Sequence, residues 1–265
     1  MKSINNIGDE NRLTKDYEAA GTDIGDYSEN APIVRSAKEI NSYELDKIIQ
    51  GVDVISEISS YVADYTADQR DKRLQACLNG VFATGGALDT ADHVTTATTI
   101  LDAAAIGAGK LLLGNQKRDL KTLIVHPKQF NDMFNNALIE YVSANAFSNN
   151  ALISGDIPTY LGMQVVESEE ICALIGGKYH AYLMGGKPLY LGFQRSLNMW
   201  NKFFPEKAGG LTMLGWTQHY APGIKGCSWN AVSTLNPTDV QLATAANWTL
   251  EAATKAVPIV LIKTT

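Results

Sequence analysis

The sequence contains few of the residues that carry catalysis or bind metals. It has three cysteines, Cys77, Cys172 and Cys227, and only four histidines among 265 residues. An odd number of widely spaced cysteines predicts neither a disulfide framework nor a paired zinc site. We therefore expect three buried free thiols in a reducing compartment. No two histidines have the spacing of a helical zinc site, so the sequence predicts no metal ligands.

The chain also lacks a long apolar run and an excess of positive charge. No run approaches the roughly 20 residues that a membrane span needs, and the polar N-terminus predicts no signal peptide. The formal net charge of −6 argues against a general affinity for nucleic acid or membranes, but it allows a local basic patch. With 45% hydrophobic and 19% charged residues, the chain can form a substantial core, in one large domain or two smaller ones.

The sequence contains no complete motif for phosphate binding or for hydrolysis. Residues 107–110, Gly-Ala-Gly-Lys, resemble part of a phosphate-binding loop. That loop needs a glycine where Ala104 stands, and a serine or threonine where Leu111 stands. The chain has no Gly-x-Ser-x-Gly motif, and His126 is expected to have a structural role at a helix start. We therefore predict no catalytic residue, no cofactor-binding residue and no cofactor.

The strongest periodic pattern is helical and covers residues 41–83. Asn41 and Glu44 have the spacing of a capping box, and Gly51 is expected to separate a short first helix from a long second one. The long helix would cover residues 52–83 and measure about 48 Å. Because this length is far above the average for globular proteins, the helix is expected to cross a large domain or to act as a strut.

The other segments predict an α+β fold with pairing between distant strands. Residues 1–40 are polar and predict an extended arm in which only residues 33–34 look like a strand fragment. Residues 89–99 predict a polar linker. The remaining expected elements are a helix from Thr98 or Thr99 to Gly114, a strand at 123–125, a helix from Pro127 to about Tyr141, strands at 163–166, 181–184, 189–192 and 211–220, a helix from Pro237 to Ala246 capped by Asn236, and a strand at 257–262.

Five aromatic residues in the second half of the chain are expected to be core residues or interface anchors. No basic clusters are interleaved with them, so they do not predict a platform for stacking nucleic-acid bases. These residues are Trp200, Phe203, Phe204, Trp216 and Trp229.

Several short motifs follow one another in a fixed order along residues 50–265. They are Gly51-Val52-Asp53 with the helix that ends in Leu78-Asn79-Gly80-Val81-Phe82-Ala83, residues 100–104, residues 123–127 with His126-Pro127, the run Ile-Pro-Thr-Tyr-Leu-Gly-Met-Gln-Val-Val at 157–166, residues 181–185 and 191–192, Pro222-Gly223, Ser228-Trp229, Asn236-Pro237, Leu242-Ala243, Asn247-Trp248 and Lys255. In order and spacing they resemble the major capsid (coat) proteins of tailed bacteriophages, which have the Hong Kong ninety-seven type of capsid fold.

This resemblance implies a division of the chain. Residues 1–42 would form an N-terminal arm with a remnant of the extended loop, and residues 43–99 a peripheral (P) domain with the long spine helix. Residues 100–220 would form most of a mixed α/β axial (A) domain, and residues 221–265 would return to close the fold. Only about 40 residues precede the spine, and they match the later part of the family's loop, so no clasp or cross-linking chemistry is carried over.

The resemblance also implies a structural protein rather than an enzyme. The chain would self-assemble as pentamers and hexamers of an icosahedral shell around phage DNA, which it would contact without sequence specificity. Scaffold, protease or portal proteins would be further partners, and no membrane would be involved. The protein would be made in the host bacterial cytoplasm and located in the virion, with residues 1–40 ordered only against neighbouring subunits.

Three other functions are compatible with the sequence. An encapsulin-like nanocompartment shell would share the fold but enclose cargo protein. A non-assembling adaptor or tail-junction protein of the same kind of virus is a second alternative. The third is an α+β hydrolase or transferase, whose deep pocket would contain His126, His180 or Cys172.

Overall fold

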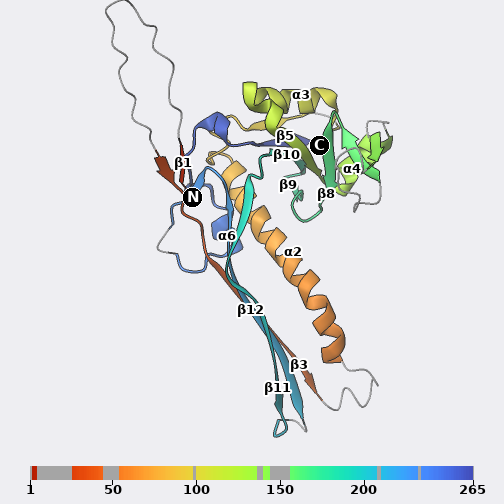
Figure 1. Cartoon of the computed structure of the whole chain (residues 1–265), viewed down its shortest axis with the longest axis vertical. Helices are drawn as coiled ribbons and strands as arrows, with labels where there is room; N and C mark the ends of the chain where they lie inside the picture. The colour runs from red at the N-terminus through yellow and green to blue at the C-terminus, as the bar shows by residue number, and fades with distance from the viewer. Residues whose placement is uncertain are drawn as a thin grey trace, which may run out of the picture.

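The structure, a computed structural model, describes residues 2–4, 26–43, 54–97, 100–135, 140–143, 156–207, 210–231 and 234–264. An eight-stranded sheet forms a rounded body, and a three-stranded sheet extends from it beside a long helix (Figure 1). We call this helix, α2, together with strands β3, β11 and β12 the elongated lobe. The predicted mixture of helices with strands paired over long distances is confirmed.

Helix α2 (Val54–Phe82) is the predicted long helix. Its 29 residues correspond to a length of about 44 Å. In its first half the buried positions form a narrow stripe that includes Val62, whereas Leu74, Cys77, Leu78 and Val81 belong to a last third that is buried on several sides. The reason is that the first half lies only on the three-stranded sheet, while the end of the helix enters the body.

The sheet of the elongated lobe contains β3 (Val34–Tyr43), β11 (Leu189–Phe204) and β12 (Leu211–Ile224). The strands are antiparallel, and β12 lies between the other two. The register of β11 against β12 shifts between Phe193 and Arg195 and again between Arg195 and Asn198. Both β11 and β12 are longer than predicted, and β12 continues through residues 222–223, where the sequence predicted its end.

The prediction for the N-terminal region is wrong in two respects. Residues 34–43 are a strand and not part of an irregular arm, and Asn41 therefore belongs to β3 instead of capping a helix. Strand β1 (Lys2–Ile4) also pairs with β2 (Asp26–Ser28), where the sequence predicted no strand. The rest of the expected short helix, residues 44–51, lies outside the described residues.

The body is built on a mixed sheet in the order β4-β15-β10-β5-β8-β7-β6, with β9 on β10. The pairs β4–β15 and β5–β8 are parallel, and the other pairs are antiparallel. The strands are β4 (Val94–Thr96), β5 (Leu120–Val125), β6 (Glu140–Ser143), β7 (Asp156–Tyr160), β8 (Met163–Glu167), β9 (Leu174–Ile175), β10 (Lys178–Gly185) and β15 (Ile259–Thr264).

The two faces of this sheet are covered by different helices. Ala181 and Leu183 of β10 pack in a core shared with α3 (Ala103–Leu112) and α4 (Pro127–Asn135). Tyr182 and Met184 face the other way, into the core that contains the end of α2. Alternate residues of β10 thus lie in the cores on the two faces of the sheet. This explains why the sequence of this strand is a continuous apolar run.

The glycines that suggested a phosphate-binding loop lie inside helix α3. A side chain at Gly109 would approach Leu183 Cδ1 to 3.0 Å and Ile262 Cδ1 to 3.2 Å. The glycine therefore allows the helix to lie close to the sheet. Asp102, and not Thr98 or Thr99, caps this helix, since its side chain accepts a hydrogen bond from the Ala105 N–H.

Two connecting regions also differ from prediction. The expected linker at 89–99 contains β4, and the ring of His93 is buried within hydrogen-bond distance of the carbonyl oxygens of Thr254 and Ile259. Tyr141 lies in β6 rather than in the preceding helix. The remaining short elements are η1 (Gly114–Asp119), β13 (Cys227–Trp229), which pairs with β14 (Trp248–Leu250), and η3 (Thr254–Ala256).

The predicted helix from Pro237 to Ala246 is shorter and interrupted. Helix α6 (Asp239–Leu242) is one turn long and is followed by η2 (Ala245–Asn247). Thr238 rather than Asn236 is its N-cap, and Thr238 forms a capping box with Gln241. Asn236 has a positive φ of 61°, a conformation that ends the preceding segment instead of starting a helix.

Candidate assembly surface

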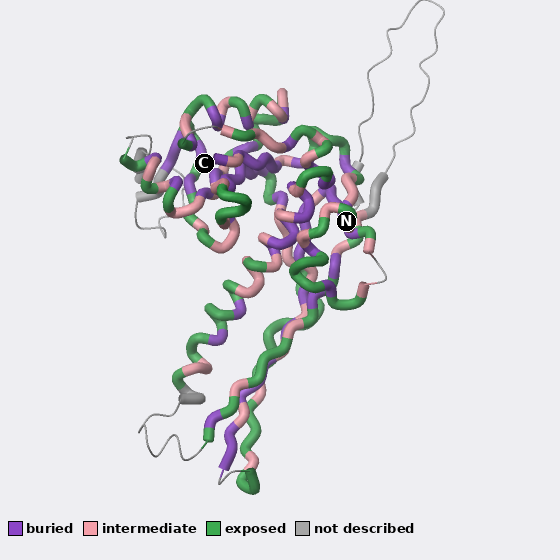
Figure 2. The backbone as a smooth tube through the Cα atoms, turned by 180° about the vertical axis from the view of Figure 1, so that it is seen from behind, coloured by how far each residue is buried: buried purple, intermediate pink, exposed green. Residues whose placement is uncertain are grey.

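The elongated lobe has a very small core. Val62 of α2 packs with Leu214 and Trp216 of β12, and Ile40 and Ile58 lie against them. Figure 2 shows buried residues concentrated in the body, whereas much of the elongated lobe is exposed or half-buried. One helix on one narrow sheet leaves the far side of each open to solvent.

Large apolar side chains are exposed on this lobe. Phe203 near the tip of the β11–β12 hairpin is 57% exposed, and Tyr61 on α2 is 62% exposed. Exposed aromatic and aliphatic residues on one part of a soluble protein are typical of protein–protein contact surfaces. The exposed apolar residues of the lobe are Tyr43, Tyr61, Tyr65, Phe193, Leu197, Met199 and Phe203.

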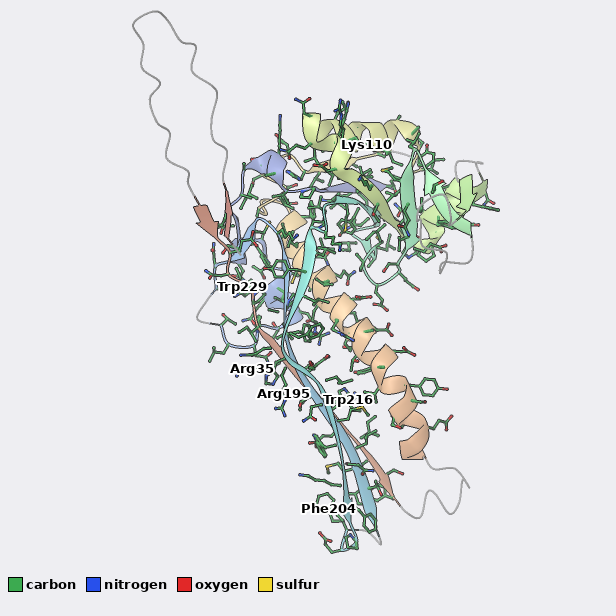
Figure 3. All side chains as sticks on the ribbon, in the orientation of Figure 1. Arg35, Lys110, Arg195, Phe204, Trp216 and Trp229 are labelled. Atoms are coloured by element: carbon green, nitrogen blue, oxygen red, sulfur yellow. The ribbon has the colours of Figure 1, made fainter. Side chains whose placement is uncertain are left out.

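The face of the three-stranded sheet away from α2, the outer face, carries a row of basic residues. His219 of β12 pairs with Arg35 of β3 on one side and with Arg195 of β11 on the other. Figure 3 shows both arginines on the side away from α2, whereas Trp216 points toward the helix. In the described part of the chain neither guanidinium makes an ion pair. Two cations on either side of one strand repel each other, so an anion at this row would be stabilising.

The same face is basic and aromatic farther toward its tip. Trp200 lies over Gly215, where an added Cβ would clash with the indole ring. Lys202 Nζ lies 5.1 Å from the centre of the Trp200 ring, at a distance typical of a cation–π contact. Glu39 is the one carboxylate on the outer face of these three described strands. This face is therefore positive, although the whole chain has a net charge of −6.

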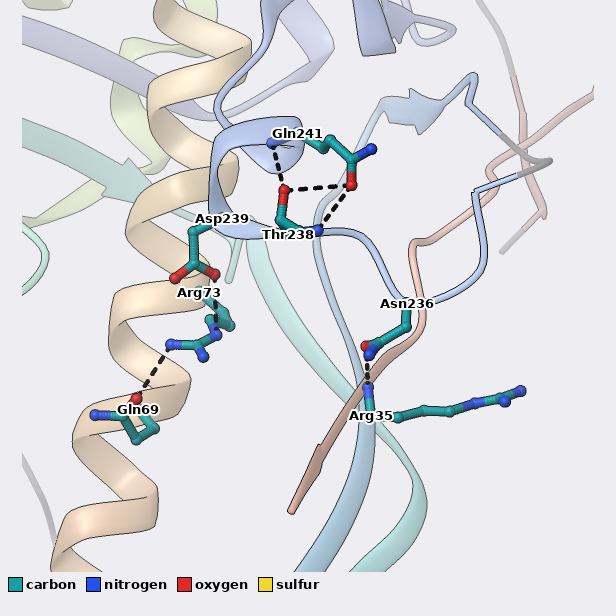
Figure 4. Close-up of polar contacts among 7 residues, drawn as sticks. All are labelled: Arg35, Gln69, Arg73, Asn236, Thr238, Asp239 and Gln241. Carbon is teal, nitrogen blue, oxygen red and sulfur yellow. Dashed lines mark hydrogen bonds and ion pairs between the residues drawn. The ribbon is translucent and has the colours of Figure 1, made fainter. Parts of the chain in front are cut away.

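Polar contacts hold this face against the rest of the molecule (Figure 4). The Asn236 side chain accepts a hydrogen bond of 2.8 Å from the backbone N–H of Arg35. Three residues farther along, Asp239 forms an ion pair of 3.0 Å with Arg73 on α2, and Arg73 Nη1 donates to Gln69 Oε1. The segment 236–239 therefore links β3 to α2 and fixes the position of Arg35.

The predicted aromatic anchors divide between core and surface. Trp216 and Trp229 are buried, and Trp229 packs edge-on against Trp248 with ring centres 5.1 Å apart. Phe203 is exposed, while Trp200 and Phe204 are half-buried. The sequence analysis missed Arg35 and Arg195 because they are far apart in the sequence and meet only through β12.

The three cysteines are free and buried, as predicted. Burial raises the pKa of the Cys227 thiol to about 12, and burial also raises the pKa values of Cys77 and Cys172. An activated thiol nucleophile needs the opposite shift. Among the described residues no group of three or more His, Cys, Asp or Glu side chains could hold a metal ion, and no helix is long and apolar enough to cross a membrane.

His126 has the predicted structural role at the start of α4. Its backbone N–H donates to Gln129 Oε1, and its Nδ1 accepts from the Lys128 N–H, each over 3.1 Å. His180 on β10 is in a different environment. Burial, followed by the charge of Lys263, lowers the pKa of His180 to about 4.

We expect stability to fall as the pH decreases from about 6.5 to about 4. In this range the unfolded chain binds a proton at His180 and the folded chain does not, so acidification favours unfolding. Thermal unfolding across the range should therefore depend less on pH in His180→Gln than in the wild type. Parallel curves for the wild type and His180→Gln would contradict this expectation.

Comparison with known proteins agrees with this architecture. The chain is 25% identical over 255 residues to the major capsid protein of Bacillus phage SPP1, an alignment that covers 91% of this chain and 74% of that protein. The fold is similar to the capsid of cyanophage Pam1, with a TM-score of 0.63 and 12% identity over 100% of this chain and 83% of the other. The fold is also similar to the capsid of Helicobacter pylori bacteriophage KHP30, with a TM-score of 0.63 and 10% identity over 100% of this chain and 84% of the other.

An encapsulin has a similar fold. The holo-encapsulin complex from Synechococcus elongatus PCC 7942 matches with a TM-score of 0.54 and 11% identity, over 91% of this chain and 75% of the other. At such identities the likeness to solved structures shows the fold alone. The family model described as phage capsid protein, however, matches residues 39–193, which is more than half of the chain. The chain therefore belongs to the phage capsid protein family and is a structural subunit of the major capsid protein type.

Proposed function

We propose that this protein assembles through its elongated lobe into a closed icosahedral shell that encloses phage DNA. The observation that carries the proposal is the lobe itself, which combines a minimal core with exposed apolar side chains and an unpaired basic row. Such a lobe loses apolar exposure and charge repulsion when neighbouring subunits cover it. In a symmetric shell these contacts repeat in every subunit, and many modest interfaces add up to a stable particle.

The N-terminal arm of a neighbouring subunit is the proposed partner of the basic row. In residues 1–28 the acidic residues outnumber the basic ones, so the segment is complementary in charge to Arg35 and Arg195. The acidic residues are Asp9, Glu10, Asp16, Glu18, Asp23 and Asp26, and the basic residues are Lys2, Arg12 and Lys15.

The domain division follows from which segments pack together. Residues 34–43, 54–82 and 189–224 make up the elongated lobe, which corresponds in this proposal to the peripheral domain. The eight-stranded sheet with α3 and α4 corresponds to the axial domain. A boundary at residue 220, as the sequence suggested, would fall inside β12, so we place the change near residue 188 instead.

The finer functional expectations are part of the same proposal. The subunits would form pentamers and hexamers with the help of scaffold, protease or portal proteins, and the chain would catalyse no reaction. It would be made in the host bacterial cytoplasm and would contact packaged DNA without sequence specificity. Because the whole chain is acidic, such contact would depend on local Lys and Arg residues.

Light scattering combined with negative-stain electron microscopy of the purified protein tests the proposal. We expect closed particles, or pentamers and hexamers, that dissociate into folded subunits when the contacts are weakened. A protein that stays monomeric at all concentrations, also with its natural phage proteins present, would contradict shell assembly and would favour an adaptor or tail-junction role. Shells that enclose protein rather than DNA in infected cells would favour the encapsulin-like alternative.

A further inference from the structure

A groove lies where the end of α2 meets β9, β10 and β15. Its volume is about 540 Å³. Phe82, Ile175 and Ala243 provide apolar lining, and Lys178 and Lys263 provide two ammonium groups. None of the described residues that line the groove is acidic.

The strand register explains why the basic groups of the groove converge. His180 of β10 is directly opposite Lys263 of β15 in the antiparallel pair. Lys178 lies two residues before His180 and therefore points to the same face of the sheet. The desolvation of His180 and the positive charge of Lys263 both keep the histidine neutral, so an anion bound beside them would favour its protonation.

Two residues that line this groove each have a buried polar atom without a hydrogen-bond partner among the described residues. His180 is 6% exposed, and its Nδ1 makes no hydrogen bond. Asn79 Oδ1, on the last turns of α2, also makes none within the part of the chain that the structure describes. A buried polar atom without a partner is destabilising by about 1–3 kcal/mol, so both atoms point to a ligand that has hydrogen-bonding groups.

The groove continues along α2 into a second hollow of about 570 Å³ that shares Asn79 and Ala243 with the first and reaches Lys72. Here Lys72 forms an ion pair with Glu170, and Arg73 pairs with Asp239. Glu169 also lines this hollow and makes no ion pair within the described residues. The groove is therefore cationic at one end and carries a carboxylate at the other. Along α2, Lys72 and Asn79 are seven residues and therefore about 10 Å apart, which is the length of three extended residues.

We propose that this groove binds the carboxyl-terminal peptide of a second protein, with an apolar last residue and a Lys or Arg about three positions before it. The terminal carboxylate would lie between Lys178 and Lys263, and the apolar side chain against Phe82 and Ile175. A peptide N–H would donate to Asn79 Oδ1, and the upstream cation would face Glu169. Inorganic phosphate offers neither the apolar group nor the N–H donor, so a peptide fits this lining better.

Fluorescence anisotropy of a labelled peptide, acetyl-Lys-Ala-Ala-Leu with a free carboxylate, tests the proposal on the full chain. We expect binding at least about 10-fold tighter than that of the same peptide with a carboxyl-terminal amide. Lys178→Gln and Lys263→Gln should each weaken binding about 5-fold or more, whereas Lys121→Gln, on exposed surface of β5, should not change it. The ring signals of His180 should also titrate at higher pH when the carboxylate peptide is present.

Equal affinity for the carboxylate and amide peptides would overturn the proposal. The two lysines would then only stabilise the free carbonyl groups at the C-terminal end of α2. Competition by inorganic phosphate as strong as that by the peptide would also overturn it in favour of a general anion site. Loss of binding in Lys178→Gln and Lys263→Gln counts only if thermal unfolding shows that these variants remain folded. The measurement does not require assembled shells, so its failure is distinguishable from a failure of shell assembly.

Discussion

Alanine in place of Gly80 is expected to lower the free energy of unfolding by about 3 kcal/mol. Gly80 is buried in the last turns of α2, and an added Cβ would clash with the carbonyl oxygen of Leu242 and the indole of Trp248. These two groups are themselves joined by a hydrogen bond of 2.8 Å from Trp248 Nε1. The extra methyl group must therefore separate the helix from α6 or break this bond.

Thermal or urea unfolding of the variant measures the effect, and a second glycine provides the control. Gly107 in α3 has no atoms within 4 Å of the position of an added Cβ. Gly107→Ala should therefore stabilise the protein by up to about 1 kcal/mol, as alanine does in an open helix position. If Gly80→Ala unfolds like the wild type, the close contact between α2 and α6 is not tight in solution.

Reversing the charge of the basic row should prevent assembly while the subunit stays folded. Arg35→Glu and Arg195→Glu together replace two unpaired cations on exposed positions of β3 and β11. An acidic neighbouring arm would then be repelled instead of attracted, and like-charge contacts across an interface cost several kcal/mol. We expect light scattering to show subunits or small oligomers in place of particles, with circular dichroism like that of the wild type.

A matched variant tests whether assembly depends on the position of the charge or on the net charge of the chain. Lys117→Glu in η1 also makes the chain more acidic, but it lies away from the elongated lobe. If one reversal there blocks assembly as strongly as either single arginine reversal, net charge and not the basic row controls assembly. Because exposed charges are screened by salt, the wild type should also assemble less readily as the ionic strength rises.

Elements with strong local patterns could be predicted from the sequence. Helix α2 differs by only a few residues from its predicted bounds, because a long run of apolar residues at helical spacing predicts a helix without information from other segments. Strand β5 and the helix that starts at Pro127 were also predicted, since an apolar run and a proline at the first helical position are local signals.

Elements that depend on distant partners could not be predicted. Apart from Val34 and Ile40, strand β3 shows little alternation of apolar and polar residues. It is a strand because β12 pairs with it along ten residues. The local capping signal at Asn41 is weaker than this pairing. β11 is largely exposed, and most of its residues from 194 to 202 are polar, so the predicted strand at 189–192 covers only its apolar beginning.

The candidate surfaces show the same limit. The basic row joins Arg35 with Arg195, and the groove joins His180 with Lys263, in each case through strand register. Composition alone predicted only that a local basic patch was possible. The exposed aromatic residues were recognised as candidates, but their division into buried and exposed sets required the structure.

The two register shifts in β11 affect how copies of this protein can meet. Within the described chain β11 pairs only with β12, so its other edge presents free backbone amides and carbonyls over part of its 16 residues. A regular edge of that length would invite another strand to add to it and allow sheets to grow without limit. The shifts on both sides of Arg195 bend the edge and interrupt this row of backbone groups. Copies that meet here are left to recognise each other by side chains, which permits a closed particle of finite size and disfavours a fibre.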